Sequence, residues 1–252
     1  MWTDGRYYIQ AERQLEQGWT MMKMEQEVPM WFTFIKTSLS AGQVVGINYA
    51  QYPASGLETR KKFFEDAGLV VKCVPNLVDA VWGDERPPRP ANPVNVLDTE
   101  FAGVASWDKQ QTIAAKIKDK GFDALLITTL DDICWLTNLR GTDIAYNPVF
   151  FANALFYPSQ IESQNALTVY TDMDRMSAIS EYLGTQHIEI APYDQIYTKL
   201  EELKGNGKKI GIHMDTCNAD LHNFCGDLAV KTDNTIKDNK CKKNAAEMEG
   251  MR

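Results

Sequence analysis

Histidines and carboxylates are the residues of this sequence that could hold a metal ion. The three histidines are His187, His213 and His222, and none of them belongs to an HExxH or HxH motif. A hydrolytic metal site needs several carboxylates and imidazoles that converge on one point. A lone histidine is more often a surface or core residue. We therefore expect no metal ligand and no metal site in this chain.

The most concentrated acidic pair is Asp131-Asp132. Neighbouring residues of an extended chain point in opposite directions, so this spacing does not make an acid/base pair. We expect the two carboxylates to cap a helix and to lie on its solvated face. The sequence also lacks a GxSxG motif and a glycine-rich loop that follows a strand, which are signatures of nucleophilic and phosphate-binding sites. The prediction is that this chain carries no catalytic residue.

The cysteines are odd in number and form no CxxC pair: Cys73, Cys134, Cys217, Cys225 and Cys241. This usage is typical of buried, reduced thiols in a cytosolic protein. A disulfide framework or a zinc site is the less favoured alternative.

One segment, ICWLTNLRGTDIAYNPVFF at residues 133–151, has the composition of a contact loop. The Arg140 guanidinium can present a planar fork to a carboxylate, either that of Asp143 or one from a partner. Two interpretations stay open. The segment is a buried loop held by side-chain hydrogen bonds, or it is a rim that contacts a substrate or another domain. The second interpretation gives the candidate contact residues Trp135, Arg140, Asp143 and Tyr146.

Alternating helices and strands must position this segment. Ser106 is placed to cap a helix over residues 107–120, which Gly121 ends. The continuous apolar run at 123–128 predicts a strand in a sheet covered on both faces. Further strands are expected at 149–156, 166–170 and 209–213, and a further helix at 172–183. The alternation predicts an α/β layered domain.

Two parts of the sequence resemble each other at a nearly constant offset. Trp2-Thr3-Asp4 matches Tyr170-Thr171-Asp172 at an offset of 168, and Val45-Gly46-Ile47 matches Ile210-Gly211-Ile212 at an offset of 165. Each motif is weak alone, but their shared order favours an internal duplication. By this interpretation the chain begins within its first domain, because the second copy carries about 65 further residues ahead of its matched segment.

A proline-rich segment separates the two copies. Residues 83–93 read GDERPPRPANP and hold four of the ten prolines in the chain. Proline fixes φ and lacks an N–H donor, so this segment is expected to be a stiff, extended connector.

Composition excludes several classes of protein. The formal net charge is −8, which argues against a nucleic-acid binder because such proteins need clustered Lys and Arg. The longest uncharged runs are too polar for a membrane span, and no apolar signal core occurs near residue 1. We therefore expect a globular, cytoplasmic protein without nucleic-acid or membrane partners.

Three motifs resemble the cytosolic Xaa-Pro aminopeptidases of the creatinase/prolidase superfamily. They are WTDGRYYIQAERQL at 2–15, WGDERPPRP at 82–90 and the segment at 133–151. The closing KKNAAEMEGMR at 242–252 is similar to the helix that opens the catalytic "pita-bread" domain of that family. The resemblance implies a metalloprotease-type hydrolase, truncated at both ends, that removes an N-terminal residue when proline follows.

The resemblance also implies a domain organisation. We expect tandem creatinase N-terminal-type domains, each an α/β fold with a mixed sheet flanked by helices, of which the first is incomplete. The expected bounds are 1–82 for the first domain, 83–95 for the linker, 96–236 for the second domain and 237–252 for the start of the catalytic domain.

For the chain itself the resemblance implies no activity. The family binds two manganese ions through residues of its catalytic domain, and none of those ligands can be carried over to this sequence. We expect a region that shapes the cleft for peptides with proline in second position, or that mediates assembly in the full enzyme. The alternative is a stand-alone, non-catalytic interaction module that forms a homodimer.

Overall fold

The computed structural model describes residues 1–252, and the chain in it divides into two compact units. Unit 1 comprises Met1–Asn48 and Gly56–Asn76, and unit 2 comprises Tyr49–Ser55 and Leu77–Arg252. None of the helices is both long and apolar enough to cross a membrane.

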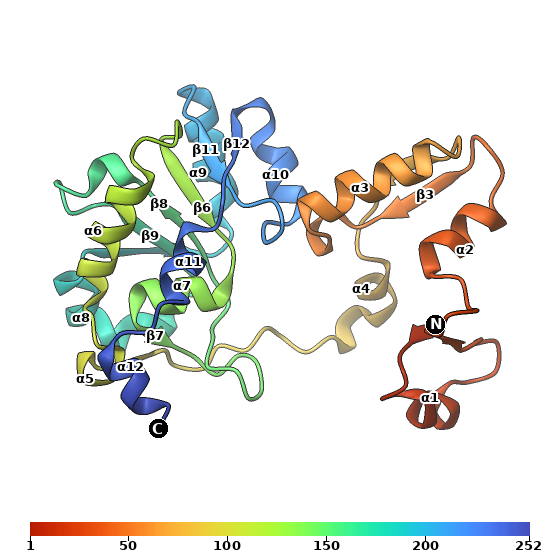
Figure 1. The fold of residues 1–252 in the computed structure, drawn as a ribbon, viewed down its shortest axis with the longest axis horizontal. Helices are drawn as coiled ribbons and strands as arrows, with labels where there is room; N and C mark the ends of the chain where they lie inside the picture. Colours follow the sequence, from red (N-terminus) through yellow and green to blue (C-terminus); the bar gives the residue numbers. More distant parts are fainter. The chain divides into compact units, whose positions relative to one another are not determined.

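Unit 2 is built on a six-stranded mixed sheet with the strand order β10-β9-β8-β6-β11-β12 (Figure 1). Only β8 runs antiparallel to its two neighbours, and all other adjacent pairs are parallel. The strands are β6 (Ala124–Ile127), β8 (Asn153–Phe156), β9 (Leu167–Thr171), β10 (Ile188–Pro192), β11 (Ile210–Ile212) and β12 (Ala229–Lys231). The expected mixed sheet of an α/β fold is therefore confirmed.

Helices cover both faces of this sheet, so unit 2 has three layers (Figure 1). Along β6, Leu125 and Ile127 pack into one core with residues of α6, α7, α8 and α11. Leu126 points the other way and packs with residues of α9 and α10, because successive side chains of a strand face opposite sides. The α-helices of unit 2 are α4 (Leu77–Trp82), α5 (Thr99–Ala102), α6 (Ser106–Ile117), α7 (Leu130–Thr137), α8 (Ser180–Thr185), α9 (Gln195–Gly205), α10 (Ala219–Cys225), α11 (Thr235–Lys240) and α12 (Ala245–Gly250).

Short 3₁₀ helices connect several of these elements. The structure contains η1 (Tyr49–Gln51), η2 (Gly83–Glu85), η3 (Pro158–Gln160), η4 (Asp174–Ile179) and η5 (Gly226–Leu228). The helix expected at 172–183 is thus two elements, η4 followed by α8. The expected extended connector begins with the η2 turn, and only the residues after it lack helical structure.

Two local predictions on unit 2 are wrong. Ser106 is the first residue of α6 and its hydroxyl donates to the Leu136 carbonyl, so Ala105 and not Ser106 occupies the N-cap position. The strand expected at 149–156 begins only at Asn153. The preceding residues form a loop instead, because the Phe151 N–H donates to the Asp143 carboxylate at 2.7 Å and not to a neighbouring strand.

Unit 1 contains two parallel strand pairs. The strands β1 (Trp2–Thr3) and β2 (Met22–Lys23) form one pair, and β3 (Val44–Ile47) and β4 (Val70–Cys73) form the other. The helices that accompany them are α1 (Tyr8–Gln14), α2 (Trp31–Ser38) and α3 (Ala54–Glu65), and the last begins with two residues that belong to unit 2.

The order of elements in unit 1 occurs again in unit 2. The segment β9-α8-β10-α9-β11-α10-β12 has parallel pairs β9–β10 and β11–β12, as β1–β2 and β3–β4 are parallel in unit 1. In unit 2 the strands β8 and β6 lie between the two pairs and join them into one sheet. This repeated order agrees with the duplication inferred from the sequence.

Two stretches of the first 82 residues belong to unit 2 and not to unit 1. Residues 49–55 belong to unit 2, as do residues 77–82, although the sequence assigned both to the first domain. The Ala54 N–H donates to the Cys217 carbonyl at 2.9 Å, and the Ala219 N–H donates to the Tyr52 carbonyl at 2.8 Å. We call residues 49–55 the strap. The domain bounds derived from the sequence stay a prediction.

Candidate functional site

The candidate contact loop begins where α7 ends. Asn138 adopts a left-handed conformation with φ 54° and stops the helix, as asparagine often does at such positions. The chain then enters β7 (Leu139–Arg140), which pairs antiparallel with β5 (Asn95–Val96). A loop of residues 141–152 leads from β7 to β8. The loop is therefore anchored to the sheet at one end and to the β5–β7 ribbon at the other.

The centre of this loop is held by a buried ion pair. The Asp143 carboxylate accepts two hydrogen bonds from the Arg175 guanidinium, at 2.5 and 2.8 Å, and the two side chains are 0 % and 2 % exposed. Arg175 also donates through Nε to the Asn92 carbonyl at 2.9 Å, so it links the loop to the proline-rich segment. Because the pair is bidentate and its remaining polar atoms have partners, both charges are compensated.

Of the two partners considered for Arg140, a carboxylate of a partner molecule or that of Asp143, the structure excludes Asp143, because its carboxylate is bound by Arg175. Arg140 instead donates through Nη1 to the carbonyls of Cys134 and Leu139, at 2.8 and 2.9 Å. Cys134 lies in the last turn of α7, where carbonyl groups have no helical partner, and a cation is favoured there by the helix dipole. Arg140 thus fixes the junction between α7 and β7.

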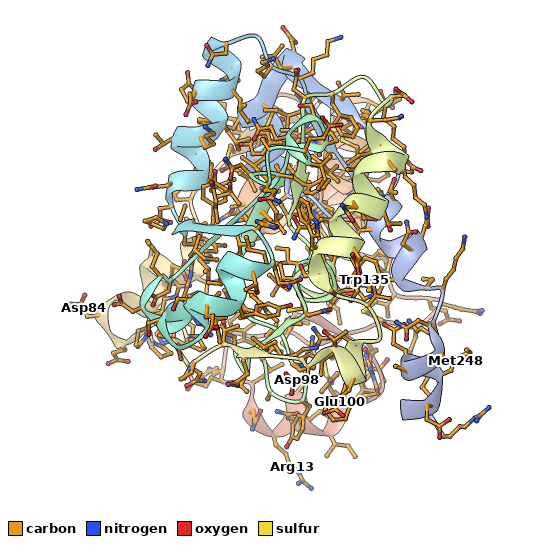
Figure 2. All side chains as sticks on the ribbon, turned by 90° about the vertical axis from the view of Figure 1, so that its left-hand side faces the viewer. Arg13, Asp84, Asp98, Glu100, Trp135 and Met248 are labelled. Atoms are coloured by element: carbon orange, nitrogen blue, oxygen red, sulfur yellow. The ribbon has the colours of Figure 1, made fainter.

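Trp135 lies on α7 beside α6 (labelled in Figure 2) and covers a buried lysine. The Lys109 ammonium lies 4.6 Å from the centroid of the Trp135 ring and donates to the Trp135 carbonyl at 2.9 Å and to Asn138 Oδ1 at 2.5 Å. Burial lowers the pKa of Lys109 to about 8, since desolvation disfavours the charged form. This cluster ties α6 to the end of α7.

Tyr146 stands at the tip of the loop. It is the most exposed large hydrophobic side chain, at 108 %, and its backbone has a positive φ of 62°. The tip is a tight turn in which the Asn147 N–H donates to the Ile144 carbonyl at 3.1 Å. A positive φ costs about 1–3 kcal/mol for a residue other than glycine and persists where the surroundings fix it. The Tyr146 ring is therefore fully exposed, on a turn whose backbone conformation is fixed.

Gly141 allows the two arms of this loop to approach each other. A Cβ atom at this position would lie 2.6 Å from the Phe150 Cβ and 2.9 Å from the Val149 carbonyl oxygen. The Gly141 N–H donates to the Pro148 carbonyl at 3.3 Å, and the Asp143 N–H to the Val149 carbonyl at 3.1 Å. The turn that carries Tyr146 depends on this close approach.

The four predicted residues lie on three successive elements, Trp135 on α7, Arg140 in β7 and Asp143 and Tyr146 in the loop that follows, and they do different things. Asp143 is buried and cannot be reached by a ligand, Arg140 binds backbone carbonyls, and Trp135 packs on Lys109. Only Tyr146 is presented fully to solvent. Sequence reasoning missed Arg175 and Lys109, whose charges gave no signal because their partners lie far along the chain.

The acidic pair at the start of α7 has a structural role. Asp132 is buried and accepts hydrogen bonds from Lys240 Nζ at 2.6 Å and from Asn234 Nδ2 at 2.8 Å. Asp131 also pairs with Lys240. Neither side chain caps α7, so the expected cap is wrong for both residues. Asp132 is also buried, so the expected solvated position is wrong for it. The pair joins α7 to α11.

No group of three or more His, Cys, Asp or Glu side chains in residues 1–252 is placed to hold a metal ion. The residues present therefore do not fit the two-metal centre that the resemblance implies. Of the five unpaired cysteines, Cys73 and Cys241 are exposed, contrary to the expectation of buried thiols. Burial raises the pKa of the Cys134 and Cys225 thiols to about 11, which keeps them protonated at neutral pH.

Comparison with known proteins identifies the fold. The family model of the creatinase/prolidase N-terminal domain matches residues 85–247, well over half of the chain. The chain belongs to the creatinase/prolidase N-terminal domain family. Its match covers the sheet of unit 2, the candidate loop and α11.

Relatives of this family member resemble the entire chain. The probable Xaa-Pro aminopeptidase P of Coprinopsis cinerea is 36 % identical over 100 % of this chain and 42 % of its own length, and that of Laccaria bicolor is 34 % identical over 100 % and 39 %. The crystal structure of the X-prolyl aminopeptidase of Caenorhabditis elegans matches with a TM-score of 0.86 and 28 % identity, over 99 % of this chain and 41 % of that one. It is described as a cytosolic enzyme with a di-nuclear active site. The chain thus spans about 40 % of the length of the relatives it matches.

Proposed function

We propose that this chain is the N-terminal, non-catalytic region of an Xaa-Pro aminopeptidase, a cytoplasmic hydrolase that releases an N-terminal residue when proline follows. The observation that supports this most is the match to the C. elegans enzyme, which extends over 99 % of this chain at a TM-score of 0.86. The relatives from C. cinerea and L. bicolor carry the corresponding name. The substrates of the whole enzyme are then peptides with proline in the second position.

The metal chemistry belongs to the part of the relatives that this chain does not span. In this proposal two metal ions, manganese by resemblance, are held there, because residues 1–252 contain no cluster that could hold one. A di-nuclear metal centre supplies activated water for hydrolysis. The present chain contributes no ligand to it and is inactive alone.

The role of this region is to shape the entrance for the peptide. The Tyr146 turn is the feature suited to this role, because its ring is fully exposed while its backbone is fixed by Gly141 and by the Asp143–Arg175 pair. A rigid aromatic side chain loses little entropy when it binds, so it makes an efficient contact. Tyr146 contacts the peptide or the catalytic domain, and Trp135, Arg140 and Asp143 position it.

The first experiment measures activity of the chain alone. The purified chain is incubated with an X-Pro-Pro peptide, with and without Mn²⁺, and release of the first residue is followed by mass spectrometry. We expect no metal-dependent release. Release above the rate of a metal-free control would contradict the assignment as a non-catalytic region.

The second experiment tests the Tyr146 turn in an active enzyme. A chimera carries this chain in place of the matching 42 % of the C. cinerea relative, with Tyr146→Ala as the variant and the exposed Phe101→Ala on α5 as the control. We expect Tyr146→Ala to raise KM by about fivefold, which corresponds to about 1 kcal/mol of lost contact, and Phe101→Ala to leave it unchanged. Equal KM values for both variants would show that Tyr146 does not contact the peptide at the entrance.

The alternative function is a stand-alone interaction module that forms a homodimer. It draws on the exposed apolar side chains of the first 82 residues, among them Trp19, Val78 and Val81. Sedimentation at micromolar concentration separates the two proposals. A dimer that dissociates on dilution supports the module, and a monomer at all concentrations counts against it.

A further inference from the structure

The strap contacts its own counterpart in the internal duplication. The offset of 165 that relates Val45-Gly46-Ile47 to Ile210-Gly211-Ile212 also carries the strap onto residues 214–220, which we call the repeat segment. The strap leads from β3 into α3, and the repeat segment leads from β11 into α10. Both segments therefore come from the same part of the duplicated sequence, and both belong to unit 2.

The two segments follow the same backbone course. The helices α3 and α10 begin at Ala54 and Ala219, which are 165 positions apart. The residues just before them, Pro53 and Asn218, form an isolated antiparallel bridge with each other. In each segment one turn separates the preceding strand from this bridge. The offset that was inferred from strand motifs thus holds through both loops, and each loop contacts its equivalent.

The hydrogen bonds between the strap and the repeat segment are reciprocal. The Ala54 N–H donates to the Cys217 carbonyl at 2.9 Å, and the Ala219 N–H donates to the Tyr52 carbonyl at 2.8 Å. Exchanging each residue for the one 165 positions away converts the first of these bonds into the second. Such a contact is isologous, which is the kind that two identical subunits form about a two-fold axis.

The contact is buried at its centre. Ala54 and Ala219 are 2 % and 1 % exposed, and Cys217 is 1 % exposed. A third hydrogen bond, from the Ser55 N–H to the Met214 carbonyl at 3.1 Å, also holds the strap in place. Small side chains at both helix starts let the two backbones approach each other closely.

Charge distinguishes the strap from the repeat segment. The repeat segment contains Asp215 and Asp220, where the strap has Ala50 and Ser55. Two repeat segments would therefore bring like charges to the same contact, whereas the strap brings none. Like charges disfavour an interface, so the internal pairing with the strap is the more stable of the two pairings.

We propose that the repeat segment is a self-complementary surface, and that the partner it fits is a second copy of this chain. When the strap is displaced, two chains pair through residues 214–220 about a two-fold axis. The Ala219 N–H of each chain donates to the partner's Cys217 carbonyl, and the two Asn218 residues lie opposite each other. In the intact chain the strap occupies this surface as a tethered competitor, with an effective concentration on the order of millimolar.

Sedimentation of the full chain tests the proposal. The variant Ala54→Pro removes the N–H that bonds to Cys217 and adds atoms at a buried site, while proline remains compatible with the first residue of α3. The control is Ala245→Pro, the same change at the first residue of α12. We expect Ala54→Pro to dimerise at least about tenfold more tightly than the wild type, because the strap no longer competes for the surface. The control should associate as the wild type does.

Cysteine cross-links locate the interface in chains whose exposed thiols are removed by Cys73→Ser and Cys241→Ser. The hydrogen bonds flank the pair formed by Pro53 and Asn218, so the two Cα atoms are close enough for a disulfide. In Ala54→Pro, adding Asn218→Cys should give a disulfide-linked dimer on a non-reducing gel. Adding Pro53→Cys as well should lock the strap within the chain and restore the monomer, and reduction should release the dimer again.

Salt provides a further readout, because Asp215 and Asp220 of two copies repel each other. Added sodium chloride should strengthen the Ala54→Pro dimer by screening this repulsion. A dimer formed through the exposed apolar side chains of the first 82 residues would not respond to the strap lock, which separates this proposal from the homodimer module.

Two results would overturn the proposal. The first is a folded Ala54→Pro variant that associates no more tightly than Ala245→Pro. The second is a dimer that Asn218→Cys does not cross-link. If urea unfolding of Ala54→Pro is not cooperative, Ala54→Leu replaces it, because leucine overfills the same buried site and preserves the helix. The same two results then decide.

Discussion

At the residue scale, the buried Asp143–Arg175 pair is the contact on which the candidate loop depends most. Its partners lie 32 residues apart in the sequence, whereas Arg140 lies only three residues from Asp143. Sequence reasoning considered only the nearer arginine as a partner within this chain for Asp143, because spacing is all that it can use. Folding brings the backbone carbonyls that bind Arg140 within its reach. Folding also buries the Asp143 carboxylate, which then needs the Arg175 cation as its partner.

Breaking this ion pair should destabilise unit 2 strongly. Arg175→Met leaves the buried Asp143 carboxylate without its cation, and we expect a loss of about 3–5 kcal/mol in the free energy of unfolding. The double variant Asp143→Leu/Arg175→Met should recover much of that loss, since it leaves no unpaired charge. Urea unfolding measures both values.

Glu201→Gln is the matched control for the ion pair, because it breaks the exposed pair with Lys204. We expect it to cost no more than about 1 kcal/mol. If Arg175→Met were as mild as this control, the pair would not be what holds the loop.

Lys109 should make stability depend on pH in a defined direction. Its pKa is about 8 in the folded chain against a usual 10.5, so between these values the unfolded chain binds more protons than the folded one. The free energy of unfolding therefore rises with pH through this window. We expect the wild type to gain stability relative to Lys109→Met as the pH rises from about 8 to about 10.5, the window set by that shift.

Denaturant unfolding at several pH values tests the Lys109 prediction. The comparison with Lys109→Met removes the contributions of other titrating groups, which are common to both chains. A stability difference that stays constant with pH would show that Lys109 keeps its ordinary pKa.

At the element scale, the clearest predictions from sequence were the buried strands. The apolar run at 123–128 became β6, and the run at 209–213 became β11. Such runs are informative because a strand covered on both faces must be apolar at every position. The loop before β8 escaped prediction, since its apolar residues resemble a strand and only the Asp143 side chain diverts its backbone hydrogen bonds.

Gly141 should tolerate no side chain. Gly141→Ala places a Cβ against Phe150 and the Val149 carbonyl, and we expect a loss of about 1–3 kcal/mol together with a displaced Tyr146 turn. The control is Gly184→Ala in α8, where nothing lies within 4 Å of the new Cβ and the change should raise stability by up to about 1 kcal/mol. Thermal unfolding distinguishes the two, and equal midpoints would mean that the loop adapts.

At the scale of the whole molecule, the two units differ in the size of their cores. Of the twelve largest fully buried side chains, only Phe64 belongs to unit 1. The sequence motifs that favour a duplication lie on strands of both units, but the two separate strand pairs of unit 1 could not be predicted. Their short lengths, of two and four residues, give too few alternating positions for a pattern.

This difference predicts uneven protection from hydrogen exchange. Amides of residues 1–48 and 56–76 should exchange much faster than those of 104–232, because local opening exposes less apolar surface where the core is small. Mass spectrometry of deuterated peptides measures the two rates on one sample. Equal protection factors in both units would contradict the prediction.

The strap has a consequence for protease cleavage. The proline-rich connector at 86–94 has no regular structure and is mostly exposed, so it is a natural place for a protease to nick the chain. Such a cut would leave the strap on the shorter fragment, while its hydrogen-bond partners Cys217, Met214 and Ala219 stay on the longer one. The two fragments of the cleaved protein should therefore stay associated and elute together. Neither fragment alone would contain all the residues that form unit 2.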